Sequence, residues 1–182
     1  KKSLLLADEN LEITHDIVIS AIGELASSKL ITKNNLLEEM LSTNYIYPAK
    51  CLEIISDIFL KENLSKEKTI LGITSVAGER GRAINFHYGA AKSAFTVFLS
   101  GLRQKLSNTK INVITISLGF VKTKMTKNLN TPSFLTSTPE KVSKDIINCI
   151  EKKKLVFTPF VWRIIILIIK LIPESIFKKL NF

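Results

Sequence analysis

Three side chains near the middle of the chain have the types and spacing of a proton-transfer site. Tyr88 and Lys92 are four residues apart in a segment with helical character, so their side chains should share one helix face. An ammonium beside a phenol favours the phenolate and should lower the pKa of the tyrosine towards neutrality. Ser75 ends an apolar run typical of a buried strand, at the edge of a sheet where ligands bind in open α/β proteins. We predict that Ser75 hydrogen-bonds a substrate carbonyl while Tyr88 transfers a proton.

The segments that must position these residues alternate between buried strands and helices. Apolar, β-branched runs predict strands buried on both faces at residues 16–22 and 111–117, like the run that ends at Ser75. Helical spacing predicts long helices over residues 34–63, 88–106 and 138–152, the first of them irregular around Pro48. A short strand at 155–158 follows. This alternation is typical of the α/β class with a parallel sheet.

The residues T-S-V-A-G around Ser75, followed by Tyr88-x-x-x-Lys92, resemble the signature of the short-chain dehydrogenase/reductase family. The resemblance runs from about Asp16 to the C-terminus. It implies a Rossmann-like, doubly wound parallel sheet in three layers. The family's first strands and glycine-rich phosphate-binding turn find no match in the chain, which begins at Lys1. We therefore expect a fragment that is inactive alone.

The resemblance implies a catalytic set of Ser75, Tyr88, Lys92 and Asn44 that reduces a ketone with a nicotinamide cofactor. Lys92 would also bind the nicotinamide ribose, and Asn44 would hold a water that links the lysine to solvent. By residue type alone, Asn44 is equally well an asparagine that bonds a helix neighbour. The cofactor would be NADP or NAD, with NADPH favoured.

The ends of two strands match the family's cofactor-binding positions. Ser20-Ala21-Ile22-Gly23 corresponds to the family's Asn-Asn-Ala-Gly, of which only the glycine is kept. The segment from Leu118 to Thr123 resembles the motif Pro-Gly-x-x-x-Thr, with leucine in place of proline. The cofactor contacts expected from these matches, beside Tyr88 and Lys92, are Ala21, Ile22, Gly23, Gly119, Val121 and Thr123. Residues 124–137 correspond to the family's substrate lid.

Other reactive residues have weaker support. Arg80 and Arg82, in the turn between Ser75 and Tyr88, could meet a substrate phosphate, and are equally well explained as surface arginines. His87 is expected to pack or to face solvent. Cys51 and Cys149 belong to no C-x-x-C motif or histidine cluster, so we predict reduced core thiols and no metal site.

The net charge of +10 comes largely from dispersed lysines. A solvated surface explains most of it, and an anionic membrane or substrate is the alternative. Nucleic acid is not expected, because the aromatic residues fall at core spacings rather than among the basic runs. In the family, long helices such as those predicted here commonly form homodimers or homotetramers. A cytoplasmic location is expected.

The chain should divide into residues 1–160, the C-terminal part of a reductase domain, and residues 161–182, an amphipathic tail helix. The apolar run from Val161 to Ile172 is interrupted by Arg163 and Lys170, and is too short for the ~20 residues of a spanning helix. Trp162 and the flanking cations suit a helix lying at the inner face of a membrane. Packing against the body or a dimer partner is the alternative.

The segments S-V-A-G-E-R-G-R, N-F-x-Y-G-x-x-K and P-E-x-I-F-K-K-L resemble the decaprenylphosphoryl-2-keto-ribose reductase branch of the family. This implies a 2-keto sugar on a polyprenyl phosphate as the substrate. A soluble carbonyl or 3-oxoacyl reductase is one alternative. Another is a non-catalytic, truncated or membrane-associated scaffold, because residues 16–22 without preceding strands would present an unpaired apolar edge.

Overall fold

A parallel sheet forms the centre of the molecule, seen in a computed structural model that describes residues 16–25, 36–62, 66–127 and 129–180. Its four strands have the order β1-β2-β3-β6. They are β1 (Ile17–Ser20), β2 (Lys68–Ser75), β3 (Ile111–Leu118) and β6 (Val156–Phe157). β2 and β3 pair along their whole length, so Ser75 and Leu118 lie side by side at the carboxyl edge. The predicted parallel α/β sheet is confirmed.

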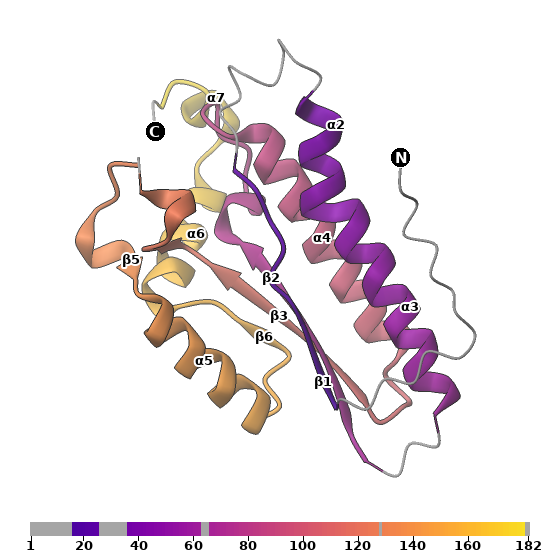
Figure 1. The fold of residues 1–182 in the computed structure, drawn as a ribbon. Helices are drawn as coiled ribbons and strands as arrows, with labels where there is room; N and C mark the ends of the chain where they lie inside the picture. Colours follow the sequence, from indigo (N-terminus) through magenta and orange to yellow (C-terminus); the bar gives the residue numbers. More distant parts are fainter. Residues whose placement is uncertain (1–15, 26–35, 63–65, 128, 181–182) are drawn as a thin grey trace.

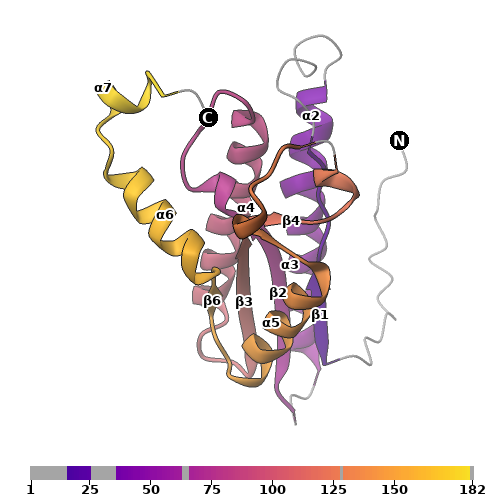
Figure 2. The same cartoon turned by 90° about the vertical axis from the view of Figure 1, so that its left-hand side faces the viewer.

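Helices cover both faces of this sheet (Figures 1 and 2). One face carries α4 (Phe86–Lys105) and a long helical segment formed by α2 (Leu36–Leu41), a π turn (Ser42–Ile46) and α3 (Tyr47–Lys61). The opposite face carries α5 (Pro139–Glu151). The chain ends in α6 (Phe160–Leu171) and α7 (Glu174–Phe177). β4 (Phe120–Val121) pairs with β5 (Thr136–Ser137) beside the main sheet.

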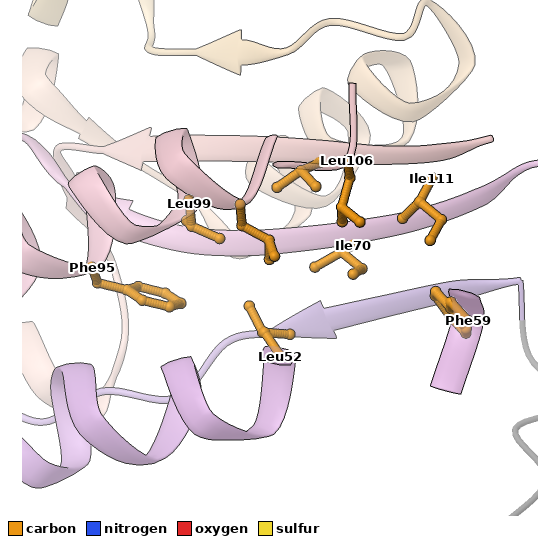
Figure 3. Packing of buried hydrophobic residues seen from close by; sticks show 9 residues of the cluster. Leu52, Phe59, Ile70, Phe95, Leu99, Leu106 and Ile111 are labelled. Carbon is orange, nitrogen blue, oxygen red and sulfur yellow. The ribbon is translucent and has the colours of Figure 1, made fainter. Parts of the chain in front are cut away.

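The main core lies between the sheet and helices α3 and α4 (Figure 3). Alternation along β2 sends Ile70 to this side, where it meets Phe59 and Phe95, and sends Leu71 to the other side, where it meets Cys149 of α5. Burying each large apolar side chain contributes ~1.5–3 kcal/mol. The first core fixes the position of α4 relative to the strands, and the second holds α5 on the opposite face.

Two sequence predictions concern the irregular parts of this framework. The irregularity expected near Pro48 is confirmed, because the π turn directly precedes it and the Tyr47 amide donates to Ser42 five residues earlier. The prediction that the first strand is buried on both faces is wrong. Ile17 and Ile19 are 44% and 47% exposed, since β1 is an edge strand and no described residue covers that face. The sequence also suggests the end of a helix at residues 1–12, which lie outside the described residues, and a polar loop at residues 24–33, most of which do as well.

Candidate active site

A close contact between two elements brings Ser75 and Tyr88 together. Ser75 ends β2, and its hydroxyl accepts a hydrogen bond from the Ala77 amide at 3.2 Å, which begins the turn Val76–Gly78. α4 then packs on that turn at Gly89, where a Cβ atom would lie 2.7 Å from the Ala77 carbonyl oxygen. The glycine therefore permits the close approach. As a result, the Tyr88 hydroxyl lies near enough to Ser75 to interact with its side chain.

Lys92 lies one helical turn further along α4 and is 4% exposed. Its ammonium donates to the carbonyl oxygens of Ile22 at 3.2 Å and Ile73 at 3.4 Å, and it lies 5.9 Å from the centre of the Tyr88 ring. Burial without a carboxylate lowers the pKa of Lys92 to about 8. The amine thus joins the carboxyl ends of β1 and β2 beneath the tyrosine.

The pKa of Tyr88 is shifted in the direction opposite to the one that the sequence predicts. Burial raises the pKa of Tyr88, and the hydrogen bond with Ser75 opposes this rise without cancelling it. The expected lowering by Lys92 is wrong for this arrangement, because the ammonium donates to backbone carbonyls and burial of the phenol dominates. A phenol with a raised pKa carries its proton at neutral pH, although the rise makes it a weaker acid.

Asn44 lies in the π turn and is fully buried. Its side-chain oxygen accepts from the Glu24 amide at 3.0 Å, and its amide nitrogen donates to the carbonyl oxygens of Glu24 and Met40, both at 2.9 Å. A Cβ atom at Gly23 would lie 3.0 Å from the Asn44 oxygen and 2.9 Å from the Lys92 nitrogen. Asn44 therefore holds the segment after β1 in place. The same segment provides the Ile22 carbonyl that accepts a hydrogen bond from Lys92.

A pocket of about 380 Å³ opens at this carboxyl edge of the sheet. Ser75, Tyr88 and Lys92 line it. So do all six residues predicted to hold a cofactor, which are Ala21, Ile22, Gly23, Gly119, Val121 and Thr123. The structure thus gathers segments separated by about 100 residues of sequence around one cavity.

Arg80 and Arg82, in the segment between Ser75 and Tyr88 that we call the catalytic turn, have different surroundings. Arg82 lines the pocket, and burial lowers its pKa. Arg80 does not line it. Arg80 instead donates to the Ile172 carbonyl at 2.7 Å, pairs with Glu174 at 2.8 Å and stacks over the Phe177 ring at 3.7 Å. The structure therefore does not support a substrate-phosphate role for Arg80, because its guanidinium is already occupied by the tail.

Trp162 is the main residue of the pocket that the sequence did not indicate. It is 7% exposed, lines the pocket, and packs edge-on against Phe120 with 5.3 Å between ring centres. The prediction that Trp162 lies in a membrane interface is therefore wrong. In the sequence, only the glycine at position 119 marked this contact. Any larger residue there would clash with the Trp162 indole.

The remaining reactive residues lie outside the pocket. His87 stacks on Phe86 at 3.9 Å, and burial raises the pKa of the free thiol of Cys149. Within the described ranges, no three His, Cys, Asp or Glu side chains lie close enough together to hold a metal ion.

The fold and the site together define a Rossmann-like α/β protein in which Ser75, Tyr88 and Lys92 line a pocket at the carboxyl edge of the sheet. A family model described as short chain dehydrogenase matches residues 16–133, and the chain belongs to that family.

Individual relatives agree with this assignment. An uncharacterized oxidoreductase of Mycobacterium tuberculosis is 31% identical over 62% of this chain and 45% of its own length. A 3-oxoacyl-[acyl-carrier-protein] reductase of Synechocystis is 30% identical over 72% of this chain and 55% of its own. The chain thus spans about half the length of these relatives. A crystal structure of a short chain dehydrogenase from Burkholderia cenocepacia in complex with NADP has the same fold, with a TM-score of 0.76 and 15% identity over 91% of this chain and 68% of that one.

Proposed function

We propose that this protein is an NAD(P)H-dependent oxidoreductase that reduces a ketone to an alcohol. One observation carries the proposal: the Tyr88 and Ser75 side chains lie together in the same pocket as the buried Lys92 amine. Family membership supports it, and the NADP bound to the related Burkholderia protein supports the choice of cofactor. We infer that NADPH is preferred and that the protein works in the cytoplasm.

The residues fit the nicotinamide half of such a cofactor. An ammonium has three N–H donors, and two hydrogen bonds of Lys92 go to backbone carbonyls, which leaves one for a ribose hydroxyl. Residues 21–23, together with Gly119, Val121 and Thr123, would form the walls around the cofactor. When bound, the nicotinamide supplies the hydride.

The residues of this chain would handle the carbonyl oxygen. Ser75 would donate a hydrogen bond to it, and Tyr88 would transfer its hydroxyl proton to the oxygen as hydride reaches the carbon. This yields the alcohol and leaves a phenolate, which the nearby Lys92 ammonium would stabilise and reprotonate. Asn44 would act as a positioning residue, because its hydrogen bonds hold the segment that receives Lys92.

Tyr88→Phe tests this proposal. Removing the proton donor should lower kcat by ~10²- to 10⁴-fold and leave NADPH affinity nearly unchanged, because the ring and Lys92 remain in place. The measurement is NADPH oxidation by the purified protein with a ketone substrate. Tyr47→Phe, at a tyrosine that is 58% exposed, is the control and should be fully active. Wild-type turnover by Tyr88→Phe would refute the mechanism.

For the substrate, we propose a 2-keto sugar carried on a polyprenyl phosphate, reduced at the inner face of a membrane. The resemblance in the catalytic turn and tail supports this, and Arg82 in the pocket could pair with an anionic group. A 3-oxoacyl thioester is the second candidate, supported by the name of the Synechocystis relative. Comparing kcat/KM for a keto-sugar phosphate and a 3-oxoacyl thioester separates the two. Saturable NADPH binding without turnover of either would leave the substrate open, whereas no NADPH binding by the folded protein would favour the non-catalytic scaffold.

We further propose that two or four copies associate through the outer faces of α3 and α4. Large apolar residues are exposed there, including Val97 at 69% and Leu60 at 41%. Light scattering of the purified protein would give the number of copies.

A further inference from the structure

Helix α6 has two apolar faces, and one of them is exposed. Its inward residues recur at helical spacing, with Trp162 buried and Ile165, Ile166 and Ile169 partly buried. Its outward residues are between 45% and 73% exposed. They are Phe160, Val161, Ile164, Leu167, Ile168 and Leu171, which we call the outer face of α6. Contiguous exposed apolar side chains of this kind mark an interaction surface.

The inward side of α6 is fastened to the active site near its first turn. The Trp162 indole donates to the Leu135 carbonyl at 3.2 Å, covers Gly119 and meets the ring of Phe120. Gly119 and Phe120 belong to the loop that lines the pocket, and Leu135 belongs to the lid region. The first turn of α6 thus forms one wall of the pocket.

The other end of α6 is fastened to the catalytic turn between Ser75 and Tyr88. Arg80 donates to the carbonyl oxygens of Ile169 and Ile172, which lie at the C-terminal end of α6, where a cation is favourable. Arg80 also pairs with Glu174, and the neighbouring Glu79 pairs with Lys170. α6 is therefore held at both ends by segments that form the site (Figure 2).

The charges around the outer face select its partner. Arg163, Lys178 and Lys179 are exposed, whereas Glu174, the one carboxylate of the described residues after 151, is paired with Arg80. A symmetric contact with a second copy would bring cations onto cations. An anionic lipid surface instead attracts each cation by about 1 kcal/mol.

The length of α6 defines how it can meet such a surface. Its 12 residues extend ~18 Å, which is short of the ~30 Å of a hydrocarbon core. No helix of the described residues is both long and apolar enough to cross a membrane. An apolar face flanked by cations suits a helix that lies in the interface.

We propose that the outer face of α6 docks on an anionic lipid surface. Because Trp162 lies on the opposite side of the same helix, docking places the pocket about one helix diameter, ~10 Å, from the lipid. A carbonyl on a lipid headgroup would then be presented to Ser75 and Tyr88. This last step rests on the proposed function, whereas the docking itself does not.

Co-sedimentation with vesicles tests the docking without cofactor or substrate. The protein should bind vesicles of 30% phosphatidylglycerol in phosphatidylcholine. The double variant Leu167→Gln/Leu171→Gln should bind about tenfold or more weakly, because two apolar contacts with lipid are lost. The control, Ile147→Gln, changes an apolar residue that is 55% exposed on α5 and should bind as the wild type does. Lys178→Gln/Lys179→Gln should weaken binding to anionic vesicles at low salt.

Trp162, the single tryptophan of the chain, reports which face of α6 meets the lipid. Because it points inward, brominated lipids should not quench its fluorescence when vesicles bind. Unchanged emission in the variants would show that they are folded. Equal vesicle binding by wild type and Leu167→Gln/Leu171→Gln would overturn the proposal. Strong quenching of Trp162 by brominated lipids would also overturn it. A third contrary result would be a wild-type dimer that does not bind vesicles and that Leu167→Gln/Leu171→Gln dissociates. Tyr88→Phe should bind vesicles as the wild type does. Failure of the proposed reaction can therefore be distinguished from failure of the lipid docking.

Discussion

Lys92 carries a buried charge whose stabilising partners are backbone carbonyls. Among the described residues its ammonium donates only to Ile22 and Ile73, and its pKa falls to about 8. A lysine in an unfolded chain titrates near ~10.4. Between these values the unfolded chain binds more protons than the folded protein, so this group makes the folded state more stable as the pH rises. Below pH 8 the buried Lys92 amine is charged, and this lowers the stability of the folded state. The proposed role of Lys92 in the site requires that charge.

Comparing the wild type with Lys92→Met tests this linkage at the residue scale. The free energy of unfolding of Lys92→Met minus that of the wild type should decrease by about 2 kcal/mol between pH 7 and pH 10, as the wild-type amine becomes neutral. Urea unfolding at several pH values measures it, and the subtraction removes the titration of other groups. A constant difference across this range would mean that Lys92 titrates normally.

At the scale of the element, α4 contains two glycines with opposite surroundings. Gly89 is buried against the Ala77 carbonyl, whereas a Cβ atom at Gly101 would meet nothing within 4 Å. Gly101→Ala should stabilise the protein by ~0.5–1 kcal/mol, since alanine is the better helix former. Gly89→Ala gains the same propensity and loses ~1–3 kcal/mol to overpacking.

Thermal unfolding and activity together check this pair. Gly89→Ala should also separate Tyr88 from Ser75, so its kcat should fall while that of Gly101→Ala stays at the wild-type level. Two variants with equal stability and equal activity would show that α4 can shift freely along the turn Val76–Gly78.

The same element shows what the sequence could and could not predict. Ser75, Tyr88 and Lys92 lie within 18 residues, so the rules for one strand, one turn and one helix are enough to bring them together. The roles of Arg80 and Trp162 depend on contacts between distant segments. Arg80 meets a carboxylate 94 residues away, and Trp162 meets a carbonyl 27 residues away. Residue type and spacing cannot identify such partners, so the sequence leaves Arg80 open between substrate and solvent, and the helix of Trp162 open between a membrane and packing against the body or a dimer partner.

At the scale of the whole molecule, the apolar surface is distributed unevenly. One exposed region is the outer face of α6. Another is the side of β1 that α5 leaves uncovered (Figure 1). Ile17 and Ile19 are exposed there, whereas Val18 packs against the core on the opposite side. β1 is also an edge strand among the described residues, so its backbone can pair with another chain. Exposed isoleucines on an unpaired edge predict self-association of the 182-residue chain.

The double variant Ile17→Thr/Ile19→Thr should therefore raise the concentration at which light scattering begins by several fold. Threonine is β-branched and keeps the strand propensity, while it removes apolar surface from the exposed side. Ile147→Thr is the control, because Ile147 is 55% exposed on the helix α5 and offers no strand edge. If the β1 variant aggregates like the wild type and Leu167→Gln/Leu171→Gln does not, the outer face of α6 drives association instead. The two exposed regions can thus be assigned separately, one to strand pairing and the other to docking.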